Sequence, residues 1–310
     1  MTTARDTYDC VVIGGGPAGA VAATVLAQQG RRVLILERGR FPRHHIGESL
    51  MPQTYWTFQR IGMLDKLKAS DFPRKESVQF VSASGRESQP YYFTDRDPHE
   101  SSITWQVRRD RFDRMMLDNA AEHGADVREG VAVRSVLFDG DRAVGVRARA
   151  EGRETDLAAD VVVDASGMAT LLSRQLRLRL PDPRLRNAAI YAYYRGARRD
   201  AGRNAGATLI VNTPDPRAWF WLIPLPNDIT SVGVVAPPST LCCGRGDDPT
   251  ATLDEEVHTC PNVRDRLASA ERISSAYTTS DFSYRADRVA GHGWVLIGDA
   301  FGFVDPVYSS

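Results

Sequence analysis

Lysine is almost absent from this chain of 310 residues. Only Lys66, Lys68 and Lys75 occur, and the other 36 of the 39 basic residues are arginines. An arginine stays protonated inside a protein, whereas burial can lower the pKa of a lysine until its amine is neutral. Because this chain uses arginine almost everywhere for positive charge, each lysine becomes a candidate for amine chemistry.

An excess of charge of one sign and cysteine pairs are also lacking. The formal net charge is zero, which argues against nucleic acid or an anionic membrane as a partner. His44 and His45 have no further ligand at a suitable spacing, so we predict no metal site. The four cysteines form no CxxC pair, and we interpret them as reduced thiols of a cytoplasmic protein: Cys10, Cys242, Cys243 and Cys260.

Long apolar runs are missing as well. The run over residues 10–27 is interrupted by glycines, and it follows Asp6 and Asp9 instead of a basic segment, so it does not fit a signal sequence. No other stretch approaches the length of a membrane span. We therefore expect a soluble protein without a membrane partner.

A glycine-rich turn joins two predicted strands near the start of the chain. Residues 8–13 and 31–37 are short apolar runs, and residues 17–29 between them have a helical pattern. The turn fits GxGxxG, in which glycines let the backbone approach a pyrophosphate and an acid at the end of the second strand binds a ribose hydroxyl. This unit predicts a Rossmann-like domain. Its candidate cofactor-binding residues are Gly14, Gly16, Pro17, Ala18, Gly19 and Glu37.

Three later segments bear on the choice of cofactor. Arg109 stands just before a predicted helix over residues 111–123, Asp164 and Gly167 follow a buried run at 161–163, and Gly298-Asp299 follows the run 294–297. In this order the segments resemble the FAD-dependent monooxygenase and halogenase superfamily, which implies FAD. The sequence has no second glycine-rich βαβ fingerprint, which favours a flavin reduced by a separate reductase.

The remaining segments predict an antiparallel sheet inserted into the FAD-binding domain. Extended patterns occur at residues 77–93, 188–196, 207–212, 218–224 and 229–236, followed by a helical pattern at 252–270. The predicted fold class is therefore α/β, with a discontinuous FAD-binding domain and a second, substrate-binding domain. We assign residues 1–75, 100–180 and 285–310 to the first domain and residues 76–99 and 181–284 to the second.

The strand AWFWLIPLP, residues 218–226, is the most aromatic part of the chain. Alternate side chains of a strand share a face, so Trp219, Trp221 and Ile223 are predicted to point one way, and the residues between them the other. Pro224 lacks a backbone donor and ends the strand. Composition alone favours a buried core strand, and a wall of a reaction chamber is the alternative.

The pattern W-x-W-x-I-P resembles a motif of the flavin-dependent halogenases. The resemblance implies that Trp219, Trp221, Ile223 and Pro224 lie beside the flavin and keep the organic substrate away from it. Ala218 stands where the family usually has glycine. A second segment, residues 43–50, resembles the R-x-x-x-G-E-S-L stretch that approaches the flavin. By the same resemblance, further cofactor contacts are Arg38, Arg43, Glu48, Ser49 and Pro306.

Lys75 ends the segment FPRK, which is similar to the F-x-x-K segment that carries an essential lysine in these halogenases. A lysine amine can take chlorine from hypochlorous acid, or its ammonium group can hold the acid by a hydrogen bond. The family continues K-x-G, whereas this chain has Ser77 in place of the glycine. A solvated surface lysine is the alternative interpretation.

The resemblance as a whole implies an enzyme that makes hypochlorous acid from reduced FAD, oxygen and chloride. It would chlorinate an electron-rich aromatic or carrier-protein-bound substrate of secondary metabolism. Alternatives on the same fold are a hydroxylase, an isoprenoid-type reductase or a non-catalytic flavin-binding fragment. Halogenases of this kind continue into a helical C-terminal region, whereas this sequence stops at Ser310, so we expect a truncated chain.

Overall fold

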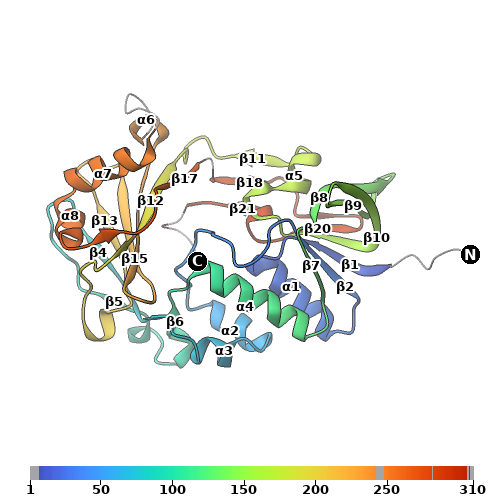
Figure 1. The fold of residues 1–310 in the computed structure, drawn as a ribbon, viewed down its shortest axis with the longest axis horizontal. Coiled ribbons are helices and arrows are strands. Elements are labelled where there is room, and N and C mark those ends of the chain that lie inside the picture. Colours follow the sequence, from blue (N-terminus) through green and yellow to red (C-terminus); the bar gives the residue numbers. More distant parts are fainter. Residues whose placement is uncertain (1–6, 242–247, 281, 306, 308–310) are drawn as a thin grey trace, which may run out of the picture.

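The computed structural model describes residues 7–241, 248–280, 282–305 and 307. It has two large sheets, which lie at opposite ends of the molecule in Figure 1. Helices flank both sheets, and the α/β class predicted from the sequence is confirmed. No helix in these described ranges is long and apolar enough to cross a membrane.

The first sheet is built around the predicted βαβ unit, β1 (Tyr8–Ile13), α1 (Pro17–Gln28) and β2 (Val33–Glu37). Its strand order is β19-β20-β10-β1-β2-β7, and β1 runs parallel to both β2 and β10. The carboxyl ends of these parallel strands therefore meet at one edge, where nucleotide cofactors bind in such sheets. The other strands are β7 (Asp126–Glu129), β10 (Arg153–Asp164), β19 (Ala290–Gly291) and β20 (Trp294–Leu296).

The two faces of the first sheet have different covers. Val12 and Ile35 pack with Leu117 of α4 (Arg109–Glu122), which lies beside α1 in Figure 1. Val11 and Leu34 point the other way and pack against strands β8 (Ala132–Asp139) and β9 (Arg142–Ala150). Both faces are apolar, as expected for the buried parallel part of a sheet.

The second sheet has the order β16-β12-β15-β14-β13-β4-β5, and β17 also pairs with β12. The predicted antiparallel pairing is confirmed for the neighbouring strands β12, β15, β14 and β13. Strand β4 pairs with β13 in parallel. Its strands are β4 (Ser77–Val81), β5 (Tyr91–Tyr92), β12 (Ala188–Arg195), β13 (Thr208–Asn212), β14 (Trp219–Pro224), β15 (Ile229–Ala236), β16 (Glu271–Arg272) and β17 (Tyr277–Ser280).

Two helices cover the outer face of the second sheet (Figure 1). They are α7 (Pro249–Thr259) and α8 (Pro261–Leu267), and their side chains Leu253 and Val263 pack against Phe220 and Leu222. We expected one helix over residues 252–270. The helix breaks at Pro261, because proline has no amide hydrogen and clashes with the preceding turn.

Shorter elements connect the two sheets. Lys75 lies on β3 (Arg74–Lys75), which pairs with β6 (Thr104–Trp105) just before α4. A three-stranded sheet has the order β11-β18-β21. The remaining elements of the described ranges are α2 (Thr54–Arg60), α3 (Leu64–Lys68), α5 (Leu171–Gln175), α6 (Pro238–Leu241), β11 (Arg179–Pro181), β18 (Tyr284–Ala286), β21 (Gly302–Phe303) and five short 3-10 turns.

Candidate active site

A cavity of about 450 Å³ opens at the carboxyl ends of β1 and β2. The helix α1 begins there with a proline in its first turn, so free amide groups face the cavity. Of the predicted cofactor residues, the lining includes Gly14, Gly16, Pro17, Ala18, Glu37, Arg38, Arg43, Arg109, Gly167, Gly298 and Asp299.

Two glycines of the turn are required by close backbone contacts. Gly14 has φ +104°, and a Cβ there would lie 2.5 Å from the carbonyl oxygen of Ala165. A Cβ on Gly19 would lie 2.0 Å from the carbonyl oxygen of Gly14. Gly19 is not part of the cavity lining, so its smallness allows the helix to approach the strand instead of touching a ligand.

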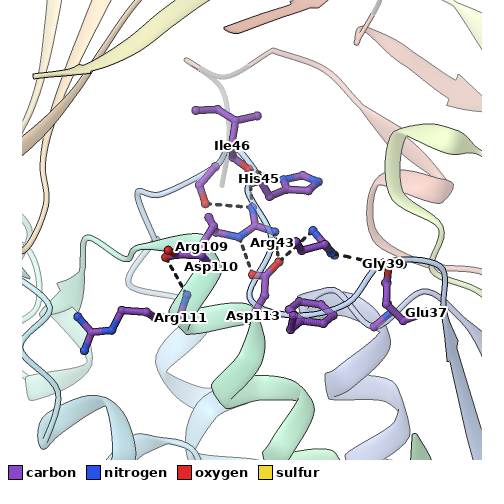
Figure 2. A network of polar contacts seen from close by, with 12 residues as sticks. Glu37, Gly39, Arg43, His45, Ile46, Arg109, Asp110, Arg111 and Asp113 are labelled. Carbon is purple, nitrogen blue, oxygen red and sulfur yellow. Dashed lines mark hydrogen bonds and ion pairs between the residues drawn. The ribbon is translucent and has the colours of Figure 1, made fainter. Parts of the chain in front are cut away.

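Glu37 ends β2 beside the glycine turn. Its carboxylate accepts hydrogen bonds from the amides of Gly15 at 2.8 Å and Gly39 at 2.7 Å. Arg43 lies 3.7 Å from the same carboxylate (Figure 2). These bonds fix the acid at the cavity wall, and each oxygen keeps a second lone pair for a ribose hydroxyl.

A buried ion-pair network holds the loop of residues 43–50 against α4 (Figure 2). Arg109 donates two hydrogen bonds to the Asp113 carboxylate, at 2.7 and 3.0 Å, and further bonds to the carbonyls of Ile46 and Gly47. Arg43 lies 3.6 Å from the fully buried Asp113. Asp113 received no role from the sequence, although the i, i+4 spacing from Arg109 is a detectable signal.

Asp164 is fully buried below the cavity instead of lining it. Its carboxylate accepts hydrogen bonds from the amides of Ser166 at 2.9 Å and Leu172 at 2.8 Å. The expected cofactor contact is therefore replaced by support of the loop that carries Gly167. Pro306, the last residue expected at the cofactor, lies outside the described residues.

The residues of this cavity fit FAD. The α1 N-terminus and a glycine turn with no side chains in the way suit a pyrophosphate, and Glu37 suits a ribose. Asp299 is also part of the lining, and burial raises the pKa of its carboxyl. It and Arg109 also line a second cavity, so the two spaces adjoin.

The second cavity, which we call the chamber, also measures about 450 Å³. It brings together residues from both sheets and from the loop 43–50. The predicted catalytic residues Lys75, Trp219, Trp221 and Ile223 all line it, and Glu48 and Ser49 line it instead of the nucleotide cavity. Pro224 ends β14 and is not part of the chamber lining.

Lys75 is buried, with only 3% of its surface exposed. Its Nζ donates to the carbonyl of Leu50 at 3.0 Å and lies 3.7 Å from the sulfur of Met51 and 5.5 Å from the ring centre of Phe93. Burial lowers the pKa of the ammonium group from 10.5 to about 8. Near neutral pH this lysine can therefore act as a hydrogen-bond donor and can also lose a proton.

The two tryptophans form one wall of the chamber. Their ring centres are 6.1 Å apart, and the indole of Trp221 donates to the hydroxyl of Ser231 at 3.1 Å. A Cβ on Gly233 of the next strand would lie 2.3 Å from the Trp221 ring, so only glycine lets the indole lie flat on β15. The core and chamber interpretations both hold, because Phe220 packs into the outer core while Trp221 faces the chamber.

The sequence interpretation missed a group of titratable side chains beside the chamber. Tyr193 donates to the Glu48 carboxylate at 2.7 Å. His44 is 3.0 Å from the hydroxyl of Tyr191 and stacks on Tyr277 with ring centres 4.1 Å apart. Tyr191 and Tyr193 alternate along β12, and this spacing is a signal that could have placed them on one face.

Comparison with known proteins agrees with this geometry. An FAD-binding-domain family model matches residues 7–308. A pyrrole-2-carbonyl carrier-protein brominase of Pseudoalteromonas luteoviolacea is 34% identical, covering 98% of this chain and 73% of that protein. The corresponding chlorinase of Pseudomonas fluorescens is 35% identical, covering 98% and 72%.

Solved structures show the same relationship. The myxobacterial chondrochloren halogenase CndH matches with a TM-score of 0.91 at 37% identity, covering 98% of this chain and 70% of that one. Identity at this level over nearly the whole chain, together with an FAD-binding cavity that adjoins a lysine chamber, shows the family. This protein belongs to the flavin-dependent halogenases, and its cofactor is FAD.

Proposed function

We propose that this enzyme halogenates an electron-rich five-membered ring, such as a pyrrole, held as a thioester on a carrier protein. Two relatives above 30% identity carry that substrate in their names. The chamber fits such a ring, since Ile210, Phe282 and Phe303 add apolar surface to its indole wall. Chloride is the halide that we predict.

The observation that carries this proposal is the position of Lys75. Lys75 lines the chamber, and its Nζ contacts a carbonyl, a thioether sulfur and an aromatic ring, none of which is a carboxylate. An amine that no acid neutralises, with a pKa of about 8, suits a polar oxidant of neutral charge. We assign Lys75 as the catalytic residue that orients the halogen donor.

Each part of the protein has a defined task in this scheme. Bound reduced FAD supplies, with O2 and halide, the hypohalous acid that the chamber receives. The α1 N-terminus and the Glu37 turn hold the cofactor, and the network around Asp113 keeps the loop 43–50 in place. Trp219 and Trp221 exclude water and keep the ring away from the nucleotide cavity. Lys75 donates a hydrogen bond to the acid and points its halogen at the ring.

The same proposal includes a separate flavin reductase and a cytoplasmic location. Cys10 and Cys260 are free thiols, which suit a reducing compartment. We keep the division of the chain into an FAD-binding domain and a substrate-binding domain at the boundaries predicted from the sequence. It is supported by the separate sheets, one formed around β1 and the other around β14.

Product mass tests this function. The protein is incubated with FAD, a flavin reductase, NADH and chloride, and offered either carrier-bound pyrrole-2-carboxyl thioester or free pyrrole-2-carboxylic acid. We expect chlorine isotope patterns on the carrier-bound ring and much less product from the free acid. A gain of one oxygen atom instead of chlorine would show a hydroxylase and overturn the proposal. Equal turnover of the free acid would overturn the carrier part of the proposal.

A further inference from the structure

A smaller cavity of about 350 Å³, which we call the side cavity, shares Glu48 with the lining of the chamber. Glu48 and Arg109 are the two residues that line both spaces among those the structure describes. The side cavity is polar, with His44, Asp110 and Tyr193 in its wall. Glu48 therefore borders both an apolar reaction space and a polar one.

The Glu48 carboxyl is only half satisfied. The side chain is 1% exposed, and Tyr193 donates to its Oε1 at 2.7 Å. Within the described part of the chain, Oε2 is buried and has no hydrogen-bond partner. Burying a polar oxygen without a partner costs free energy, so such a group in a cavity wall suggests a function. Burial raises the pKa of this carboxyl from 4.5 to about 7.

The backbone of Glu48 is fixed, so the carboxyl cannot simply turn to solvent. Its carbonyl accepts the amide of Val107 at 2.7 Å, and the bonds from Arg109 hold the residues just before it. Tyr193 reaches the carboxyl from the neighbouring sheet. The edge of the His44 ring meets Tyr193 with ring centres 5.8 Å apart, which continues the polar side chains into the side cavity.

Halogenation of a ring carbon releases a proton inside the chamber. Lys75 is an ammonium group when halogen transfer begins, and the tryptophan wall has no base. We propose that Glu48 is the base that removes this proton, and that Tyr193 and the side cavity pass it on to solvent. This inference rests on the halogenase function proposed above and adds a second catalytic residue to it.

The step balances in atoms and electrons. The ring carbon forms a bond to the halogen of the hypohalous acid, whose oxygen leaves with the bonding pair and takes a proton from the Lys75 ammonium group to become water. The carbon–hydrogen bond breaks, its electrons restore the aromatic ring, and the proton goes to the Glu48 carboxylate. The products are halogenated ring, water, neutral Lys75 and protonated Glu48. Tyr193 then passes the Glu48 proton towards the side cavity, and Lys75 regains a proton from water.

The pH dependence has a defined sign. Glu48 works as a base only when ionised, so halogenation should rise as the pH increases through about 7. The hydrogen bond of Tyr193, the nearby hydroxyl of Ser231 and the charges of Arg109 and Arg108 lower this pKa. The other titratable groups that line the chamber or side cavity are Arg43, His44, His45, Lys75, Asp110, Tyr277 and Asp299.

The variant Glu48→Gln tests this role with a ring-deuterated probe. The probe is the N-acetylcysteamine thioester of pyrrole-2-carboxylic acid, with hydrogen or deuterium on the ring. We expect kcat to fall roughly 100-fold in Glu48→Gln. Deuterium on the ring should then slow the variant by a primary isotope effect, whereas the isotope effect of the unaltered enzyme should be near unity. The rise of activity near pH 7 should disappear. FAD binding and flavin oxidation should continue.

Two further variants and an infrared measurement complete the experiment. Tyr193→Phe removes a hydrogen bond that lowers the Glu48 pKa, so its activity rise should move to higher pH. If Glu48→Gln does not fold, the pH profile of Tyr193→Phe tests the role of Glu48 in its place. Glu256→Gln, which removes another buried glutamate, should change neither the isotope effect nor the pH profile. A carboxylic-acid infrared band that titrates near pH 7 should be lost in Glu48→Gln.

The outcomes separate the two proposals. An isotope effect near unity and an unchanged pH profile in Glu48→Gln, with normal halogenation by the unaltered enzyme, would overturn the role of Glu48 alone. An unshifted profile in Tyr193→Phe would have the same meaning. If the unaltered enzyme gave no halogenated product from the probe or from the carrier-bound ring, the halogenase function and this inference would fail together.

Discussion

At the scale of single residues, the amine of Lys75, which we propose as catalytic, destabilises the folded chain. Its amine has a pKa of about 8 in the folded chain and 10.5 as the ordinary value. The folded state therefore binds a proton less tightly than the unfolded state. This penalty is fully present below pH 8 and disappears as the pH rises from 8 to 10.5.

Replacement of the lysine by an apolar residue should therefore stabilise the protein. Lys75→Met removes the charge and keeps the length of the side chain. We expect the free energy of unfolding to increase by up to roughly 3 kcal/mol at neutral pH, since one pKa unit is worth about 1.4 kcal/mol. Urea denaturation at several pH values measures this. A lower stability of Lys75→Met at pH 7 would contradict the buried, uncompensated amine.

Gly233 makes a second prediction at this scale. Gly233→Ala would place a methyl group 2.3 Å from the Trp221 ring, and overpacking of this kind costs about 1–3 kcal/mol. Loss of the indole position should also lower halogenation. The double variant Gly233→Ala, Trp221→Phe has a smaller ring and should recover much of the lost stability. If the losses in unfolding free energy of the two single variants simply added in a double-mutant cycle, the Trp221 ring would not lie against Gly233.

At the scale of elements, α4 contains two ion pairs with the same spacing and different surroundings. Arg109 and Asp113 are buried, whereas Arg114 and Asp118 are almost half exposed. Only the buried pair also holds the loop 43–50. The exposed pair Arg114–Asp118 is therefore a control for the contribution of the buried pair to stability.

Asp113→Asn should be far more harmful than Asp118→Asn. Removing one partner of a buried ion pair costs about 3–5 kcal/mol, because the remaining charge is left uncompensated. An exposed i, i+4 pair is worth only about 0.3–0.5 kcal/mol. We also expect weaker FAD binding in Asp113→Asn alone, which titration of the flavin fluorescence would detect. Similar losses in the two variants would show that the network does not organise the cofactor cavity.

The element scale also shows what the sequence could predict. The strand period placed Trp219 and Trp221 on one face, because alternation is a local property. Pro261 was a visible break that the predicted helix ignored. The parallel pairing of β4 with β13 joins segments far apart in the chain, which no local pattern reveals. The loop 43–50 has no period, so the direction of Glu48 could not be deduced.

At the scale of the whole molecule, the site is formed by parts that are distant in sequence. The first sheet and α4 build the nucleotide cavity, the second sheet provides the indole wall, and β3 brings Lys75 between them. The sequence motifs identified the glycine turn and Glu37 of the nucleotide cavity, and Lys75 and the two tryptophans of the chamber. They could not show that Asp164 supports a loop while Glu48 enters the chamber, since both depend on side-chain directions in the assembled fold.

The central claim is that halogen transfer depends on the amine of Lys75 and flavin oxidation does not. The most direct measurement compares halogenated product with NADH consumption in Lys75→Met and Lys75→Arg, with exposed Lys68→Met as control. We predict that both Lys75 variants lose product by roughly 100-fold or more while NADH consumption continues, and that Lys68→Met is unchanged. Full halogenation by Lys75→Met would contradict the account.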